Sequence, residues 1–207
     1  MHRNGARRTW LRWPGRRRAD GGMDVASLIR EIAALTDEVR ALARAARTDP
    51  LTGLANRRGW DEQFGRELAR VQRSGGGLSI ALLDLDDFKS FNDTHGHQAG
   101  DRLLVEAAAA WRGQLRDMDL LCRWGGDEFV VLLPDCSRRE AQEVIARLRP
   151  ATPRPHACTA AVAAWDGRET SHDLFRRADT ALLEQKRIRR GTDSLAPVHA
   201  EGRRSAR

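Results

Sequence analysis

The sequence predicts an α+β domain in which a central, mainly antiparallel β-sheet is covered by helices. Amphipathic helical segments alternate with short apolar strands along residues 57–188. Two of these strands, at residues 119–124 and 128–133, flank a Gly125-Gly126 turn that is typical of a β-hairpin. The length of 207 residues suits one globular domain with appendages. Because hairpin strands pair antiparallel, we expect helices to pack on a sheet of that kind.

Positive charge is concentrated at the two ends of the chain. The net charge is +7, of which residues 1–22 contribute +6 and residues 199–207 contribute +2, so the rest is close to −1. A nucleic-acid binder usually carries a basic face on its folded domain. We therefore expect no nucleic-acid partner for the domain.

Residues 1–22 and 192–207 are expected to be basic, disordered extensions. The first mixes arginines with Trp10 and Trp13 and has no sustained periodicity. One interpretation is an unstructured extension upstream of a start at Met23. The other is a basic patch that binds an anionic membrane or nucleic acid.

Nothing in the pattern predicts a transmembrane segment or secretion. The longest apolar runs, such as residues 78–83 and 129–133, are far below the roughly 18 residues that a membrane-spanning helix needs. Cys122, Cys136 and Cys158 are widely spaced, and no secretory segment precedes them. We expect reduced thiols in a cytoplasmic protein.

An amphipathic heptad helix is expected over residues 23–47, ahead of the globular domain. Asp24 is its expected N-cap, and Asp49-Pro50 should end it because proline disfavours helical geometry in the preceding residue. Apolar residues recur at alternating spacings of three and four, which is a heptad seam. The pattern fits a helix lying on its own domain and a parallel dimeric coiled coil about equally well. The seam consists of Val25, Leu28, Ile32, Leu35, Val39, Leu42 and Ala46.

The globular domain is expected at residues 48–191 and begins with a turn-rich link. An amphipathic helix follows, marked by Trp60, Phe64 and Val71 and ended by the glycines that start at Gly75. An apolar run bounded by polar residues then predicts a buried strand. In order, the later elements are the strand Leu78–Leu85, a helix at 99–115, the hairpin, a helix at 138–149, a strand at 157–164 and a helix at 171–188.

Three carboxylates stand where the predicted strands end. Asp84 and Asp86 close the first strand, and Asp127 follows the diglycine turn. Acidic residues are costly at the end of an apolar strand unless a cation or another partner balances them. Magnesium prefers one or two carboxylates together with phosphate oxygens. The pattern indicates a nucleotide–metal site in which two ions assist an attacking hydroxyl and a leaving pyrophosphate, and the alternative is a surface salt-bridge cluster.

The residues around this site resemble a known family. The run at 123–129 contains the GGDEF signature of diguanylate cyclases, the enzymes that condense two GTP into cyclic di-GMP. The resemblance spans about residues 49–190 and implies the GGDEF domain fold, which is similar to nucleotidyl cyclases and polymerase palms. The other matching blocks are Asp49-Pro50-Leu51-Thr52-Gly53-Leu54 with Asn56-Arg57-Arg58, Asp84-Leu85-Asp86 with Phe88-Lys89, Asn92-Asp93, Gly96-His97 and Gly100-Asp101, and Ala178-Asp179 with Ala181-Leu182 and Lys186.

The resemblance implies metal ligands and catalytic residues. Asp84 and Asp127, with the Leu85 backbone carbonyl, would hold two Mg²⁺ ions, or Mn²⁺ as an alternative. Asp127 or a hydroxide near it would take the proton from the 3′-hydroxyl, and Glu128 belongs to the same catalytic group. Lys89 would stabilise the charge that develops on the transferred phosphoryl group.

The resemblance also implies residues that bind the nucleotide. Asn92 and Asp101 would read the guanine edge, because a carboxylate that accepts from the ring N–H and the exocyclic amine rejects adenine. His97 would add a further ligand contact. Gly125 and Gly126 would let the backbone approach the nucleotide, where a β-carbon would intrude.

The last helix is expected to bind the outer phosphates and also departs from the family pattern. Lys186 and Arg190 would bind the phosphates, since residues four apart share one helical face. Arg189 stands where a glycine is usual, Leu183 where a tyrosine is usual, and Gly191 where an asparagine often follows.

An RxxD motif lies before the GGDEF run. Arg116 and Asp119 stand at the spacing before Gly125 that the family uses for an inhibitory site that binds the product. Arg147 would be the secondary arginine of that site. The resemblance therefore implies feedback inhibition by cyclic di-GMP.

The residues favour an active diguanylate cyclase in which each chain holds one GTP in half a site. Turnover then needs a homodimer, and the heptad helix would raise the effective concentration of the partner. The alternative is a catalytically weak or inactive GGDEF protein that acts as a receptor for cyclic di-GMP or GTP. A basic-tailed scaffold for nucleic acid or membrane is a third possibility that rests on residues 1–22 alone.

Overall fold

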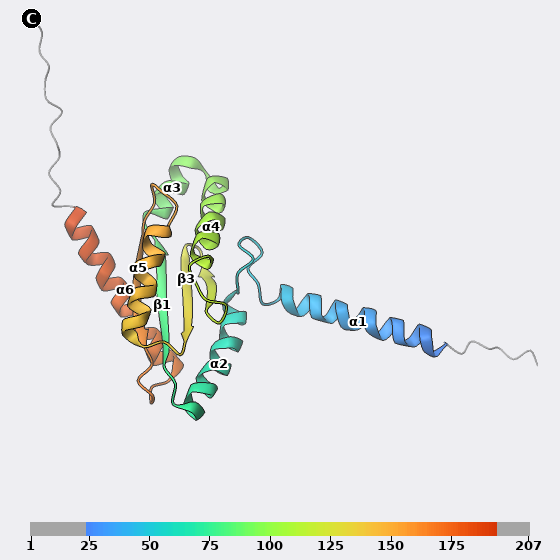
Figure 1. The fold of residues 1–207 in the computed structure, drawn as a ribbon. Helices are drawn as coiled ribbons and strands as arrows, with labels where there is room; N and C mark the ends of the chain where they lie inside the picture. The colour runs from blue at the N-terminus through green and yellow to red at the C-terminus, as the bar shows by residue number, and fades with distance from the viewer. Residues whose placement is uncertain (1–23, 194–207) are drawn as a thin grey trace, which may run out of the picture. The chain divides into compact units, whose positions relative to one another are not determined.

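The computed structural model describes residues 24–193 (Figure 1). The extension expected at 1–22 lies outside the described residues, and so does the one at 192–207 except for its first two residues, which are helical. The elements are α1 (Val25–Ala45), α2 (Arg57–Ser74), β1 (Leu78–Leu85), α3 (Phe88–His95), α4 (His97–Arg112), β2 (Leu120–Gly125), β3 (Glu128–Pro134), α5 (Arg138–Ala151), β4 (Cys158–Ala164) and α6 (Ser171–Asp193).

The chain divides into two compact units, and the boundary between Arg40 and Ala41 falls within α1. The Asp24 carbonyl accepts a hydrogen bond from the Leu28 N–H at 3.0 Å, so the helix begins where the sequence predicts. It ends at Ala45, two residues earlier than expected. No residue of α1 is buried, and the large apolar side chains of the seam are 42–70% exposed.

Four antiparallel strands form the sheet, in the order β2-β3-β1-β4. In the registers of the central strand β1, Leu83 lies opposite Phe129 of β3 and Ala160 of β4. All eight residues of β1 are buried. The α+β prediction with an antiparallel sheet is confirmed.

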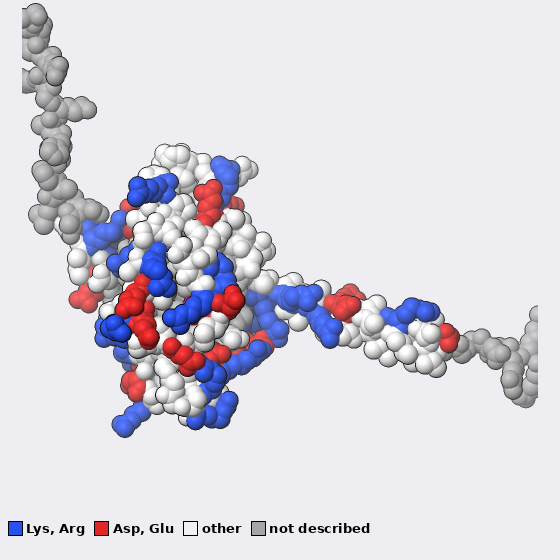
Figure 2. Space-filling model, in the orientation of Figure 1, with Lys and Arg blue, Asp and Glu red and all other residues white. Residues whose placement is uncertain are grey.

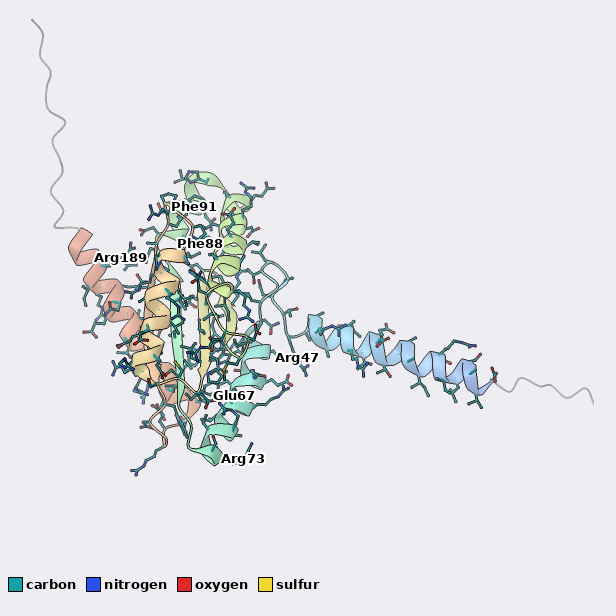
Figure 3. The ribbon with its side chains drawn as sticks, viewed as in Figure 1. Arg47, Glu67, Arg73, Phe88, Phe91 and Arg189 are labelled. Atoms are coloured by element: carbon teal, nitrogen blue, oxygen red, sulfur yellow. The ribbon has the colours of Figure 1, made fainter. Side chains whose placement is uncertain are left out.

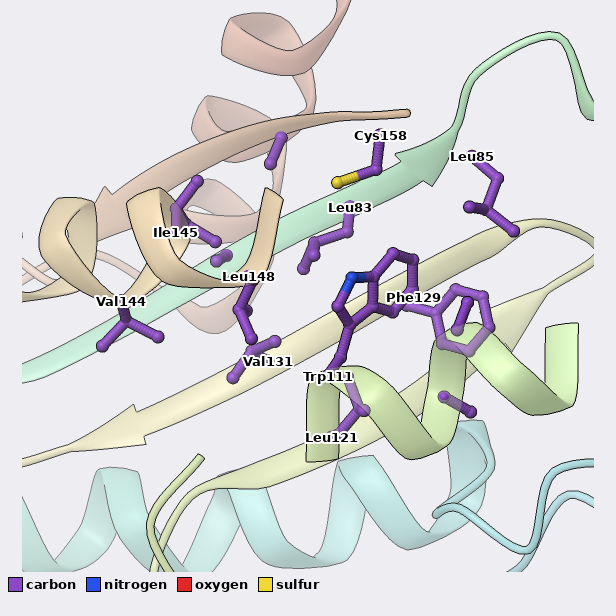
Figure 4. Close-up of a cluster of buried hydrophobic side chains, with 14 of the residues drawn as sticks. Leu83, Leu85, Trp111, Leu121, Phe129, Val131, Val144, Ile145, Leu148 and Cys158 are labelled. Atoms are coloured by element: carbon purple, nitrogen blue, oxygen red, sulfur yellow. The ribbon is translucent and has the colours of Figure 1, made fainter. Parts of the chain in front are cut away.

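Helices cover both faces of the sheet (Figure 1). Alternate residues of a strand point to opposite faces, so Leu83 packs with α4 and α5 while Leu82 packs with α2 and α6. Figure 4 shows the first of these clusters, in which the Trp111 ring meets the Phe129 ring at 5.0 Å in an edge-to-face arrangement. The domain therefore has two separate apolar cores, one on each side of the sheet.

The helix expected at 99–115 is α4, which runs from His97 to Arg112, and α3 before it is a further helix that the sequence did not predict. Gly96 ends α3 and precedes α4 with φ +82°, a conformation that glycine adopts without steric cost. The helix α3 has eight residues, and only Phe88 and Phe91 pack against the core, so its apolar pattern is too short to predict a helix. The prediction for this segment was therefore incomplete at its start.

The cysteines are free and buried. Burial raises the pKa of Cys122 to about 12 and that of Cys136 to about 11. Both thiols therefore stay protonated at neutral pH and behave as small apolar side chains. Within residues 24–193, no helix combines the length and apolar character that crossing a bilayer requires.

Trp111→Ala tests the core on the α4 side. Trp111 is fully buried and its Nε1 donates to the Thr152 hydroxyl at 3.3 Å. We expect the variant to lose about 3–5 kcal/mol of unfolding free energy through lost burial and a residual cavity. Urea denaturation measures this, with Leu183→Ala on exposed α6 surface as the control that should lose less than about 0.5 kcal/mol. Equal losses would show that Trp111 does not organise the core.

Candidate active site

The end of β1 and the β2–β3 turn lie side by side. Asp84 is opposite Glu128 in the strand register, and the Leu85 N–H donates to the Asp127 carbonyl at 3.3 Å. Strand alternation places Asp84 and Glu128 on the same face of the sheet as α2 and α6. The structure thus brings together the carboxylates that the sequence predicts as metal ligands and catalytic residues.

An ion pair fixes the β2–β3 turn to the loop before α2. Arg123 Nη1 lies 3.2 Å from each carboxylate oxygen of Asp49, and its Nε donates to the Gly126 carbonyl at 3.0 Å. Burial alone would raise the pKa of Asp49, but hydrogen bonds from Thr52 and Arg123 hold this pKa below its usual range. Arg123 and Asp49 support the site, and sequence reasoning assigned them no role beyond their motifs.

Lys186 lies against the proposed metal ligand. Its Nζ is 2.6 Å from Asp84 Oδ2, and the side chains are 24% and 10% exposed, respectively. Burial raises the pKa of Asp84, the contact with Lys186 opposes that rise, and the charges of Asp127 and Asp86 add to it. The sequence predicts that Lys186 binds phosphate, whereas here it pairs with a carboxylate.

The carboxylates form a crowded negative site. Burial raises the pKa of Glu128, and the charges of Asp84, Asp127 and Asp179 raise it further. Within the described residues, no three His, Cys, Asp or Glu side chains are arranged to hold an ion by themselves. An all-oxygen set with excess negative charge fits Mg²⁺, which takes its other ligands from water and phosphate.

Asn92 offers an unpaired polar atom beside the start of α4. Its Oδ1 is buried and has no hydrogen-bond partner among residues 24–193. A β-carbon at Gly100 would lie 1.8 Å from this atom, so a larger residue there would force the Asn92 side chain to move. A buried acceptor without a donor is costly, and an N–H group of a ligand would satisfy it once the Asn92 side chain turns toward solvent. Asp101, the other predicted guanine contact, follows Gly100 in α4 and is exposed.

Three further predicted ligand contacts are exposed. Lys89 of α3, His97 of α4 and Arg190 of α6 form no ion pair or side-chain hydrogen bond with the part of the chain that the structure describes. The two glycines of the turn have open space beside them, so the approach of a nucleotide to their backbone stays a prediction. A β-carbon at Gly125 or Gly126 would meet no protein atom within 4 Å, and only Gly126, at φ +48°, has a backbone that favours glycine.

The RxxD motif closes the turn between α4 and β2. The Arg116 N–H donates to Asp119 Oδ2 at 2.9 Å, and the Asp119 N–H donates to the Arg116 carbonyl at 3.1 Å. Asp119 is buried while Arg116 is exposed. Arg147 is exposed on α5, and within residues 24–193 it makes no hydrogen bond or ion pair with this motif.

A cavity of about 710 Å³ adjoins Glu128 on the α2 and α6 face. Sequence reasoning did not predict it, although the aromatic residues on both helices were a signal. The rings of Trp124 and Phe175 stack at 4.7 Å between centroids, and Trp60 meets Phe175 edge-on at 5.7 Å. The guanidinium of Arg57 lies 4.7 Å from the centre of the Trp124 ring. This aromatic wall anchors the residue that directly precedes the diglycine turn.

Comparison with known proteins adds an independent line of support. The family model described as diguanylate cyclase, GGDEF domain, matches residues 46–192. The chain is 43% identical over 160 residues to the diguanylate cyclase DgcP of Pseudomonas aeruginosa. The matched region covers 72% of this chain and 24% of DgcP. It is 36% identical over 194 residues to the diguanylate cyclase TpbB of the same species, covering 86% of this chain and 45% of that protein.

Solved structures show the same fold. The coiled coil and GGDEF domain of DgcB from Caulobacter crescentus, in complex with c-di-GMP, superposes with a TM-score of 0.75 at 28% identity. That match covers 79% of this chain and 93% of the DgcB chain. The chain spans less than half the length of the two curated relatives named above.

Asp84→Asn tests the electrostatics of the site in metal-free protein. Because the pKa of Asp84 is raised on folding, chiefly by burial, its ionised form destabilises the fold above that pKa. We expect the variant to unfold at higher urea concentration than wild type at pH 7. The gain should shrink as the pH falls and wild-type Asp84 becomes protonated.

The control for this measurement is Glu106→Gln, which removes a carboxylate from the exposed surface of α4. This variant should change the urea midpoint little, both at pH 7 and at lower pH. A destabilised Asp84→Asn protein at pH 7 would mean that the contact with Lys186 outweighs the cost of burying Asp84.

Proposed function

The chain belongs to the GGDEF family of diguanylate cyclases, and we propose that it condenses two GTP molecules into cyclic di-GMP and two pyrophosphates. The observation that carries this proposal is the set of carboxylates at adjacent strand ends, Asp84, Asp127 and Glu128, with Lys186 beside them. Curated relatives named diguanylate cyclases support the same activity.

In this proposal Asp84, Asp127 and the Leu85 carbonyl would hold two Mg²⁺ ions, with Mn²⁺ as an alternative. The ions would lower the pKa of the attacking 3′-hydroxyl and stabilise the leaving pyrophosphate. Asp127 accepts the hydroxyl proton, and Glu128 adds negative charge that favours retention of the cations. Lys89, which is exposed on α3, stabilises charge on the transferred phosphoryl group.

Lys186 would change partner when substrate binds. Its ammonium is a flexible point charge, and in the ligand-free protein it neutralises Asp84 at 2.6 Å. Once cations neutralise Asp84, the ammonium is available for the outer phosphates, together with Arg190 one turn further along α6. The contact in the structure thus agrees with a role in binding phosphate.

Guanine selection would fall to Asn92, Asp101 and His97. The unpaired Oδ1 of Asn92 needs a donor, and the guanine edge supplies N–H donors that adenine lacks. Asp101 accepts from the same edge, and the exposed His97 lies at the start of the same helix. These contacts would favour GTP over ATP.

A homodimer would complete the reaction, since each chain holds one GTP. The exposed apolar seam of α1 supports dimer formation, and its length of 21 residues gives three heptads. Joining two copies through α1 raises the effective concentration of one half-site for the other. The DgcB structure described above likewise comprises a coiled coil and a GGDEF domain.

The compartment and the partners are part of the same proposal. We place the protein in the cytoplasm, and the three free thiols support a reducing compartment. Figure 2 shows acidic and basic side chains intermixed on the face of the globular domain in view. A mixed surface of this kind does not favour nucleic-acid binding.

The central experiment incubates the purified protein with GTP and Mg²⁺ and quantifies cyclic di-GMP and pyrophosphate. We expect product from wild type and a loss of about 100-fold or more in Asp127→Ala, because proton transfer and cation binding both depend on this carboxylate. Glu106→Gln is the matched control and should retain activity. Removal of Mg²⁺ with EDTA should stop the reaction in every variant.

If a confirmed dimer freed of bound nucleotide forms no product, the proposed cyclase activity is wrong. In that case calorimetric titration with cyclic di-GMP and with GTP would test the alternative, a receptor.

Arg116→Ala tests product inhibition. The exposed guanidinium of Arg116 is available for a phosphate of cyclic di-GMP, and a charge-assisted hydrogen bond of this kind is worth about 1.5–3 kcal/mol. We expect the concentration of cyclic di-GMP that halves activity to rise about tenfold or more. Arg102→Ala, at an exposed position of α4, is the control. An unchanged half-inhibitory concentration in Arg116→Ala would refute the inhibitory site.

A further inference from the structure

Arg189 of α6 binds the two carboxylates that follow β1. Its Nε lies 3.4 Å from Asp86 Oδ1, and its Nη2 lies 3.2 Å from Asp87 Oδ2. The planar guanidinium presents its donors in a rigid fork, so one arginine can bridge two neighbouring carboxylates as a lysine cannot. The resemblance described above places this arginine where the family pattern has a glycine, which could not form such a bridge.

The two ion pairs differ in weight. The side chain of Asp87 is 76% exposed, and an ion pair at that exposure contributes little because water screens it. The side chain of Asp86 is only 5% exposed. It also accepts a hydrogen bond from the Thr159 hydroxyl of β4 at 2.6 Å. The pair with Asp86 is the buried one, and Arg189 Nη2 adds a hydrogen bond to Asp87, so the two contacts together restrain the chain.

The segment that Arg189 binds is a sharp corner. Asp87 has φ +56° and ψ +22°, a left-handed conformation that is unfavourable for any residue with a β-carbon. It is the N-cap residue of α3, but its side chain makes no capping hydrogen bond. The bond from the Asp86 N–H to the Ala157 carbonyl, at 3.0 Å, holds the other side of the corner. Arg189 adds a restraint from α6.

The corner joins the proposed metal ligands to the helix that carries Lys89 and Asn92. Asp84 and Leu85 lie directly before it, and α3 begins directly after it. Figure 3 labels Arg189 on α6 and Phe88 and Phe91 on α3, toward the same end of the domain. A shift of the corner would therefore move Lys89 and Asn92 relative to the metal ligands.

The position of Arg189 on α6 places it on the same side of the helix as Lys186. Residues three and four apart share a helical face, so Lys186, Arg189 and Arg190 project from one side of α6. Lys186 contacts Asp84, and Arg189 contacts Asp86. Two consecutive turns of α6 thus form ion pairs with Asp84 and Asp86, which are alternate residues of one acidic segment.

We infer that Arg189 is a positioning residue, which bonds Asp86 and Asp87 and so holds α3, with Lys89 and Asn92, in register with the metal ligands of β1. The inference rests on the proposed function, because it assigns Arg189 an effect on GTP binding. The residue contacts the corner and has no role in the chemistry itself.

The test compares Arg189→Ala with Arg189→Lys and with Arg187→Ala in the full chain. Arg187 is exposed on the same helix and forms no ion pair with the described residues, so its loss matches the change in charge. Calorimetry measures binding of a non-reactive GTP analogue with a methylene bridge between the α- and β-phosphorus atoms, in the presence of Mg²⁺. Hydrogen exchange of residues 86–95 in the ligand-free protein gives a second readout.

We expect Arg189→Ala to weaken analogue binding about five- to tenfold, as for loss of a partly buried charged contact. Arg187→Ala should change it less than about twofold. Arg189→Lys should recover part of the loss, because it keeps the charge but loses the bridge. Exchange at residues 86–95 should accelerate in Arg189→Ala and not in Arg187→Ala, while the rest of the sheet keeps its protection.

Several outcomes would overturn the inference. Equal analogue binding by Arg189→Ala and wild type would do so, even with faster exchange at the corner. Faster exchange across the whole domain would also do so, since Arg189 would then be a general stabilising residue. If wild type itself fails to bind the analogue, the proposed function fails, and the exchange data alone then show whether Arg189 holds the corner.

Discussion

The active-site end of the domain depends on neutralising the carboxylates at the end of β1. This strand is buried along its whole length, and yet Asp84 ends it on one face and Asp86 follows directly. An unpaired buried charge there would destabilise the fold by more than the adjacent apolar contacts stabilise it. α6 supplies both counter-charges, Lys186 and Arg189. The last helix is therefore required for the acidic site as well as for the core beneath it.

A second ion pair holds the opposite side of the site. Arg123 and Asp49 are 74 residues apart in sequence and connect the β2–β3 hairpin to the loop before α2. Asp49 also accepts hydrogen bonds from the N–H and the hydroxyl of Thr52, so the loop has a local restraint that does not depend on the arginine. The hydrogen bonds of Arg123 to Gly126 and Asp49 thus hold the turn that carries Asp127. They oppose the repulsion between the carboxylates, which would otherwise open the hairpin.

The sequence predicted the elements that have strong local signals. β1 has the predicted bounds because an apolar run ends at charged residues, and α2 ends at Gly75, which adopts the left-handed conformation. α3 was missed because it is only eight residues long and only Phe88 and Phe91 pack against the core, which is too short an apolar pattern to predict a helix. The grouping of the carboxylates followed from the motifs. The contacts of Lys186 and Arg189 could not be predicted, because they depend on how α6 packs against β1.

In the RxxD turn, the structural role falls on Asp119, and the ligand-binding role that we propose falls on the Arg116 side chain. Asp119 is buried and its carboxylate binds the Arg116 N–H, so this aspartate shapes the turn whether or not a ligand binds. The Arg116 guanidinium is exposed, and the turn uses only its backbone groups. Replacing Asp119 would disturb the fold together with the proposed inhibitory site, since the loss of a buried acceptor leaves a donor unpaired. Replacing the Arg116 side chain leaves the turn intact, so only the arginine can report on ligand binding alone.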